Sequence, residues 1–99
     1  MYSRAEKPSA LNISPDCLAL TNKRVIFCRP RNLGLSMDFD DYLWKEVEDC
    51  HIKEGIMGAT FTLNSVKGSS IEIDYLPKAQ ARMLYRYAQE QEEKMTEYR

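Results

Sequence analysis

The side chains that could carry catalysis are few in this chain of 99 residues. His51, the single histidine, follows Cys50 directly, and a cysteine activated by a histidine is a common nucleophile. Neighbouring residues on a strand point to opposite faces, so these two cannot act on each other. Asp38, Asp40 and Asp41 lack the glycine and downstream glutamate of a calcium-binding loop and indicate an acidic turn. We therefore expect no enzyme activity, metal or cofactor.

The three cysteines predict neither a disulfide framework nor a zinc site, because their number is odd and no two are closely spaced. Cys17 and Cys28 face each other in the hairpin described below. The sequence leaves two alternatives for this pair, a cross-strand disulfide or two adjacent reduced thiols. The odd count favours reduced thiols, which suit a reducing compartment.

Basic side chains gather around the same hairpin. Neighbouring cations can hold a phosphate through charge-assisted hydrogen bonds. The sequence therefore offers a candidate site for an anionic lipid or phosphate ligand, although a solvated basic turn would look the same. The residues are Lys23, Arg24, Arg29 and Arg31, with Lys45 expected nearby.

Two apolar positions suggest protein or membrane contacts. Ile56 and Met57 stand between two glycines at a hairpin tip, where they either insert into a partner or a membrane surface, or fold back over the domain. Met95 and Tyr98 lie in the last turns of the C-terminal helix, which are expected to project and meet either another subunit or a continuation of the chain.

Composition limits the class of protein. Apolar residues make up 43% and charged residues 29%, as in one soluble globular domain. A net charge of −1 excludes the uniformly basic surface of a dedicated nucleic-acid binder. The sequence has no apolar run that resembles a membrane span or signal peptide, so a cytoplasmic protein is expected.

The elements that position these residues are short strands followed by one helix. Residues 77–98 place Ala81, Leu84 and Ala88 on one helical face and Arg82 and Arg86 opposite. A capping residue before the helix is absent, and basic residues come early and acidic residues late, against the helix dipole. Packing must therefore hold this helix in place.

Alternating patterns predict seven strands after a flexible segment at residues 1–8. The two-residue loop Asn22-Lys23 sets the register of the first hairpin, because asparagine tolerates positive φ. Leu18 then faces Phe27 and Leu20 faces Val25 on the core side, while Cys17 faces Cys28 and Ala19 faces Ile26 on the other. Asp40-Asp41 is expected to end the fourth strand, and Trp44 to anchor a corner. The expected strands are 9–13, 17–21, 24–29, 35–39, 47–54, 59–64 and 71–74.

This order of elements resembles the bacterial pleckstrin-homology-like (PH-like) domains. The resemblance covers residues 9–98 and rests on the phrases LALTNKRVIF, EGIMGATFTL and LPKAQARMLYRYAQ. It implies a mainly β domain at residues 9–99: two nearly orthogonal antiparallel sheets in a partly open barrel, capped by the C-terminal helix.

The function that this resemblance implies is that of a non-catalytic interaction module, acting through a protein partner or self-association. The alternative is a peripheral membrane or anionic-ligand sensor that uses the basic hairpin, with Ile56 and Met57 as an apolar tip.

Overall fold

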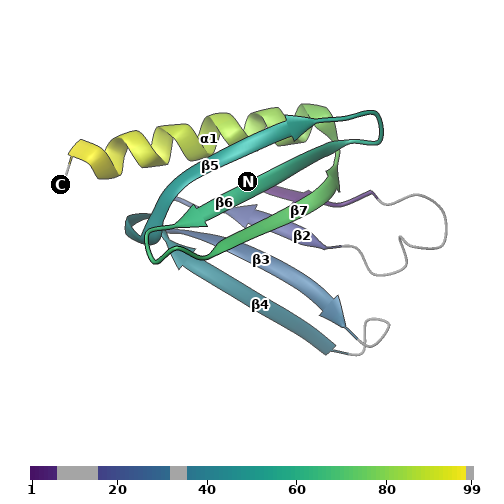
Figure 1. Ribbon diagram of the computed structural model, residues 1–99, viewed down its shortest axis with the longest axis horizontal. Coiled ribbons are helices and arrows are strands. Elements are labelled where there is room, and N and C mark those ends of the chain that lie inside the picture. Colours follow the sequence, from purple (N-terminus) through teal and green to yellow (C-terminus); the bar gives the residue numbers. More distant parts are fainter. Residues whose placement is uncertain (7–15, 32–35, 98–99) are drawn as a thin grey trace.

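The computed structural model describes residues 1–6, 16–31 and 36–97, with side chains to residue 95. In this part of the chain, two antiparallel sheets precede one helix (Figure 1). The larger sheet has the order β1-β2-β3-β4 and the smaller has the order β5-β6-β7. The elements are β1 (Tyr2–Arg4), β2 (Cys17–Leu20), β3 (Arg24–Arg31), β4 (Ser36–Leu43), the 3-10 turn η3 (Trp44–Glu46), β5 (Val47–Glu54), β6 (Ala59–Ser65), β7 (Ser70–Leu76) and α1 (Lys78–Glu97).

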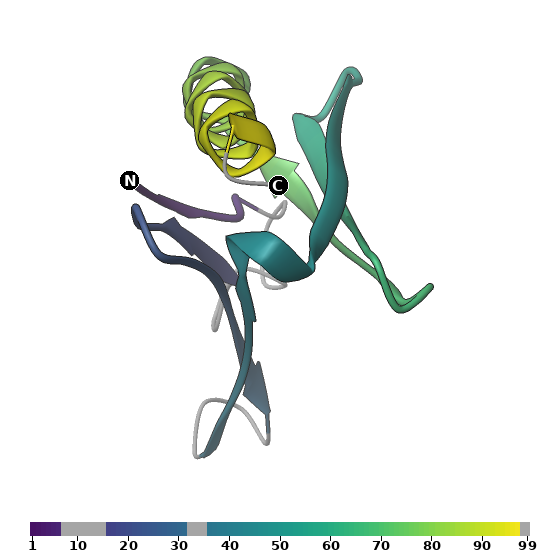
Figure 2. The ribbon, with the colours of Figure 1, turned by 90° about the vertical axis from the view of Figure 1, so that its left-hand side faces the viewer.

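The two sheets stand as diverging walls joined through η3, with α1 between them on one side (Figure 2). The helix packs against β5, β6 and η3, and also reaches β1 and β2. It therefore bridges the edge strands β1 and β5, one from each sheet. The other edge strands, β4 and β7, border a cleft that the helix does not cover.

The core lies between the walls and beneath the helix. Ala81, Leu84 and Ala88 are almost fully buried, as the helical pattern predicts. Trp44 is 2% exposed, and its Nε1 donates a hydrogen bond to the Thr21 carbonyl oxygen at 2.8 Å. The predicted corner is therefore anchored by both packing and a hydrogen bond. The strands contribute Leu18, Leu20, Val25, Phe27, Val47, Cys50, Ala59, Phe61, Leu63, Ile73 and Leu76.

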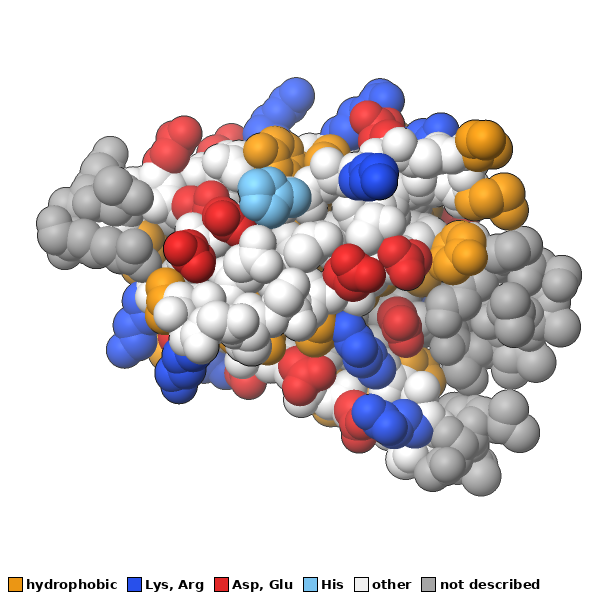
Figure 3. Space-filling view, viewed as in Figure 1, with side chains coloured by type: hydrophobic (Ala, Val, Ile, Leu, Met, Phe, Trp, Pro, Cys, Tyr) orange, Lys and Arg blue, Asp and Glu red, His pale blue; other side chains and the backbone are white. Residues whose placement is uncertain are grey.

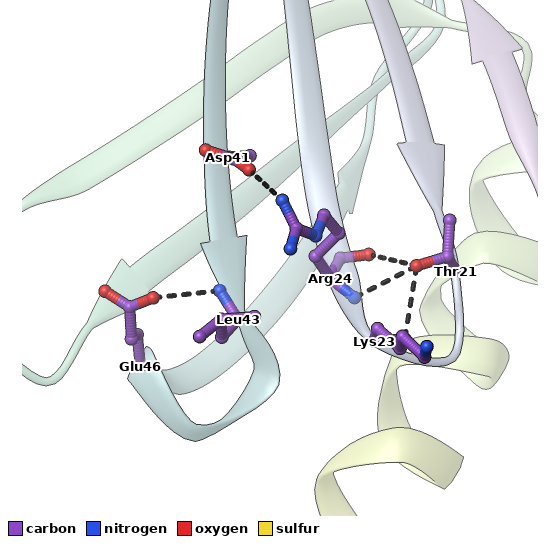
Figure 4. A network of polar contacts seen from close by, with 6 residues as sticks. All are labelled: Thr21, Lys23, Arg24, Asp41, Leu43 and Glu46. Carbon is purple, nitrogen blue, oxygen red and sulfur yellow. Dashed lines mark hydrogen bonds and ion pairs between the residues drawn. The ribbon is translucent and has the colours of Figure 1, made fainter.

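The register of the first hairpin agrees with the prediction, but the turn is made differently. Cys17 pairs with Cys28 and Leu20 with Val25. The Thr21 hydroxyl accepts hydrogen bonds from the backbone nitrogens of Lys23 and Arg24 at 3.1 and 3.0 Å (Figure 4). Tyr75 is the one non-glycine residue with positive φ in the described segments. A threonine hydroxyl, rather than positive φ at an asparagine, closes this turn.

Strand β1 corrects the expectation of a flexible N-terminal segment. Tyr2–Arg4 pair with β2, and Ser3 and Ala5 are each 1% exposed. The Ser3 hydroxyl donates to Gln80 Oε1 of α1 at 2.6 Å. Small residues fit where β1 passes close to the helix, but they give no hydrophobic pattern that marks a strand. The predicted strand at 9–13 lies outside the described residues.

Strand β4 is longer than predicted, because it continues through Asp40-Asp41 to Leu43. Asp41 forms an ion pair with Arg24 at 2.6 Å on one face (Figure 4), and Asp40 lines the open cleft on the other. Both carboxylates stay accessible to water, so they do not interrupt the strand.

Helix α1 places an acidic residue against the β5 wall. Burial, followed by the Glu92 carboxylate, raises the pKa of Cys50. Burial also raises the pKa of Glu92 above its ordinary 4.5, and nearby Asp49 adds to this effect although the Cys50 hydrogen bond opposes it. An acid whose pKa is raised by folding destabilises the folded state when it is ionised.

Replacing Glu92 with glutamine is therefore expected to raise the thermal unfolding midpoint by a few degrees at about pH 8. The folded state holds the Glu92 proton more tightly, so this gain shrinks as the pH falls through the raised pKa and vanishes below the ordinary value of 4.5. Differential scanning calorimetry across this range measures it, with Glu93→Gln as an exposed control. A gain that is the same at every pH would contradict burial of an ionised Glu92.

Candidate interaction surface

The five predicted basic residues do not form one site. Arg24 and Arg31 occupy opposite ends of the eight-residue strand β3, about 23 Å apart at a rise of about 3.3 Å per residue. Near Arg24, Lys23 and Lys45 line a depression of about 370 Å³ together with Trp44. Arg24 itself is engaged by Asp41.

The other two cations are held by neighbouring groups. Arg31 forms an ion pair with Asp38. Arg29 enters the cleft between β3–β4 and β7, where its Nη2 donates to the Glu72 carbonyl oxygen at 3.0 Å. This cleft has a volume of about 590 Å³. The predicted cations therefore lie in separate places, and carboxylates partly neutralise their charge, so they do not offer a phosphate one common site.

The cleft is acidic, which the sequence analysis did not foresee. Four carboxylate residues line it against the single cation Arg29. Acidic side chains gather across the middle of the face shown in Figure 3. The four carboxylate residues of the cleft come from β4, β7 and the residue before β2, so only the fold brings them together. The four are Asp16, Asp40, Glu72 and Asp74.

The predicted apolar tip is exposed. Ile56 is 96% exposed and Met57 is 60% exposed at the turn between β5 and β6, so neither folds back over the domain. Gly58 at this turn has a φ of 141°, and a Cβ there would lie 3.0 Å from the Leu76 carbonyl oxygen. Close backbone approach, rather than flexibility, explains this glycine.

Met95 and Tyr98 are the two residues predicted to make contacts at the end of the C-terminal helix. Met95 packs half-buried against the core and lines the same depression as Lys23 and Lys45. Tyr98 lies outside the described residues.

An exposed apolar surface lies on the outer face of the β1–β4 sheet, which the sequence analysis missed. Phe39 is 65% exposed, Tyr2 is 57% and Met37 is 46%. The strand pairing places nine apolar side chains on this face, eight of them together and Leu43 at one end, with Arg4, Arg24 and Asp41 as the charged residues around them. We call the eight the outer apolar face: Tyr2, Cys17, Ala19, Ile26, Cys28, Pro30, Met37 and Phe39.

A signal for this face is present in the sequence. The first hairpin has apolar residues on both sides, with Ala19 facing Ile26 and Cys17 facing Cys28 behind the core pairs. Strands that are apolar on both sides are typically covered on both sides. In a domain with one core, the second apolar side therefore indicates a contact surface.

The two facing cysteines on this surface are not joined by a disulfide, in agreement with the favoured prediction. The Tyr2 hydroxyl donates to Cys17 Sγ at 3.1 Å. Burial, followed by the nearby Cys17, raises the pKa of Cys28. The raised pKa disfavours a reactive thiolate at Cys28, so this side chain contributes mainly apolar area.

Two antiparallel sheets of four and three strands, followed by one C-terminal helix, define a PH-like domain. The chain belongs to the bacterial PH domain family, whose model matches residues 2–90. The match includes β1, so the domain starts earlier than the resemblance to residues 9–98 suggests. Comparison with curated proteins gives no match.

Membership in this family indicates an interaction module, and PH-like domains are generally non-catalytic. Helix α1 is too polar to cross a bilayer, and the described residues contain no other helix of spanning length. The surfaces described above therefore have to be judged as binding surfaces.

Proposed function

We propose that this domain is a non-catalytic module that binds a partner protein through the outer apolar face. The observation that supports this most directly is the exposure of Phe39, at 65%, in the middle of β4, where Met37 on the same strand and Cys28 on β3 lie beside it on the same face. An isolated exposed apolar residue is ordinary, but a contiguous apolar patch on a small domain marks a contact. Full burial of one such side chain contributes about 1.5–3 kcal/mol.

The geometry favours protein binding over the anionic-ligand alternative. Lipid headgroups would need several unpaired cations on one surface. Arg24 and Arg31 are in ion pairs, and Arg29 lies among carboxylates. Lys23 and Lys45 line the edge of an apolar depression, and two lysines are a small basic surface for a membrane.

A photo-reactive benzoylphenylalanine at position 39 tests this function, because it is close in shape to the phenylalanine that it replaces. In the cells that make this protein, irradiation is expected to produce a discrete cross-linked species. The same group at Val66, which is 52% exposed on the turn after β6, is the matched control. Mass spectrometry identifies the captured partner.

A specific cross-link from position 39 and none from position 66 would support the proposal. The absence of any cross-link from position 39, in a variant with the parent's circular dichroism spectrum, would contradict it. Cross-linking of two copies of this chain would show self-association instead of a separate partner.

A further inference from the structure

Strand β4 is a long and open sheet edge. It pairs with β3 over eight consecutive residues without a bulge, and no backbone partner lies on its other side in the described residues. Proteins usually protect such edges with charged side chains, especially lysine, or with proline, a bulge or a covering element. β4 contains neither lysine nor proline, and its charged residues are the three aspartates Asp38, Asp40 and Asp41, which repel an acidic strand but attract a basic one. The Leu43 backbone nitrogen at one end donates to Glu46 Oε1 at 3.0 Å, and the outward-facing backbone groups between residues 37 and 42 can pair with an added strand.

The facing edge, on β7, is partly occupied. Arg29 Nη2 binds the Glu72 carbonyl oxygen, and the Glu6 backbone nitrogen donates to the Tyr75 carbonyl oxygen at 2.6 Å. Two of the carbonyl groups on this strand are thus already engaged. An incoming chain would find its hydrogen-bond partners on β4.

The two sides of β4 differ in chemistry. Met37 and Phe39 belong to the outer apolar face, and Asp38 and Asp40 point to the inner side. Asp40 lines the acidic cleft, and no ion pair to it occurs in the described part of the chain. Side chains of an added strand alternate in the same way. One set would lie beside Phe39 and the other beside the cleft carboxylates.

We propose that β4 binds an extended segment of the partner protein as a fifth strand, and that this segment alternates apolar and basic residues. This inference rests on the proposed function and specifies how the partner is bound. The apolar residues cover Met37 and Phe39, and the basic residues neutralise Asp40 and the cleft. Backbone pairing supplies affinity, and the alternating side chains supply specificity.

A second copy of this chain is a poorer occupant of this edge. Antiparallel pairing of two β4 strands would place the inner sides of both strands together. Asp38 and Asp40 of one copy would then lie next to the same residues of the other. Like charges opposite each other destabilise a strand pair.

The test uses an end-blocked octapeptide that alternates lysine and valine, added to the ¹⁵N-labelled domain and followed by NMR. We expect the largest chemical-shift changes at the amides of residues 36–43. Asp40→Lys should weaken binding by about tenfold or more. Glu93→Lys makes the same charge change on the exposed face of α1 and should leave binding unchanged. A peptide that alternates glutamate and valine should not bind.

Backbone pairing is tested with two N-methylated peptides, one methylated on every lysine and the other on every valine. A strand turns only every second amide towards its neighbour, so one version should lose binding and the other keep it. Three results would overturn strand addition. They are equal binding of the two methylated peptides, equal binding of the peptide to the parent and to Asp40→Lys, and chemical-shift changes centred on β7. Concentration-dependent shifts at β4 without peptide would show a second copy there and would also overturn it.

The two proposals can fail separately. If position 39 cross-links a partner in cells and the peptide leaves β4 unchanged, strand addition is refuted and protein binding through the outer apolar face stands. If position 39 captures nothing, the proposed function fails whatever the peptide does.

Discussion

Replacing Leu84 with aspartate is expected to unfold the domain at room temperature. Leu84 is 1% exposed and lies on the helix face that packs against β5 and β6. Loss of a buried leucine costs about 2–5 kcal/mol, and a buried carboxylate adds a further desolvation penalty. Domains of this size have about 5–15 kcal/mol of stability, so little would remain. Circular dichroism should show loss of the cooperative thermal transition.

The neighbouring residue provides the matched control for this prediction. Met83 is 56% exposed on the solvent-facing surface of α1, so Met83→Asp introduces the same charge into water. We expect its melting curve to stay within a few degrees of the parent. A Leu84→Asp variant that melts like Met83→Asp would show that the helix is not packed into the domain.

Replacing Trp44 with alanine is expected to cost about 3–5 kcal/mol of unfolding free energy. This ring fills the corner at which β4 turns into β5, and its Nε1 holds the Thr21 carbonyl oxygen of the first hairpin at 2.8 Å. Both the cavity and the broken hydrogen bond contribute to the loss. Urea unfolding followed by circular dichroism measures it.

Trp44→Phe separates these two contributions. It keeps most of the buried ring and removes the indole donor, so its expected loss is the smaller part, about 1–3 kcal/mol. Equal losses for the two variants would mean that the hydrogen bond, rather than the packing of the ring, anchors the corner.

Strongly periodic elements were predictable from the sequence. The helix and the first hairpin follow directly from the spacing of Leu84, Ala88 and the Leu18–Phe27 pair, because their buried faces repeat apolar residues at the helical and strand periods. Strand β1 was missed because Ser3 and Ala5 bury little apolar surface and leave no pattern. The end of β4 was misplaced because Asp40 and Asp41 are typical of turns, although here they remain hydrated on a strand.

The candidate surface was less predictable than the fold. Arg24 and Arg31 are close in sequence, which suggested that they share a site. A strand has a large rise per residue, however, so β3 places these two residues far apart. The acidic cleft combines Asp16, Asp40 and Glu72 from three distant segments, and only the sheet arrangement shows their proximity. The outer apolar face needed the strand order as well, since Tyr2 and Phe39 lie on opposite edge strands.

The position of β1 has a consequence for biosynthesis. The first strand lies between β2 and the last helix, and the Ser3–Gln80 hydrogen bond joins residues 77 positions apart. A nascent chain therefore cannot complete this joint until α1 has left the ribosome. Such long-range closure slows folding relative to local contacts. During translation, the apolar interior between the two sheets therefore stays uncovered until α1 has been made and packs against it.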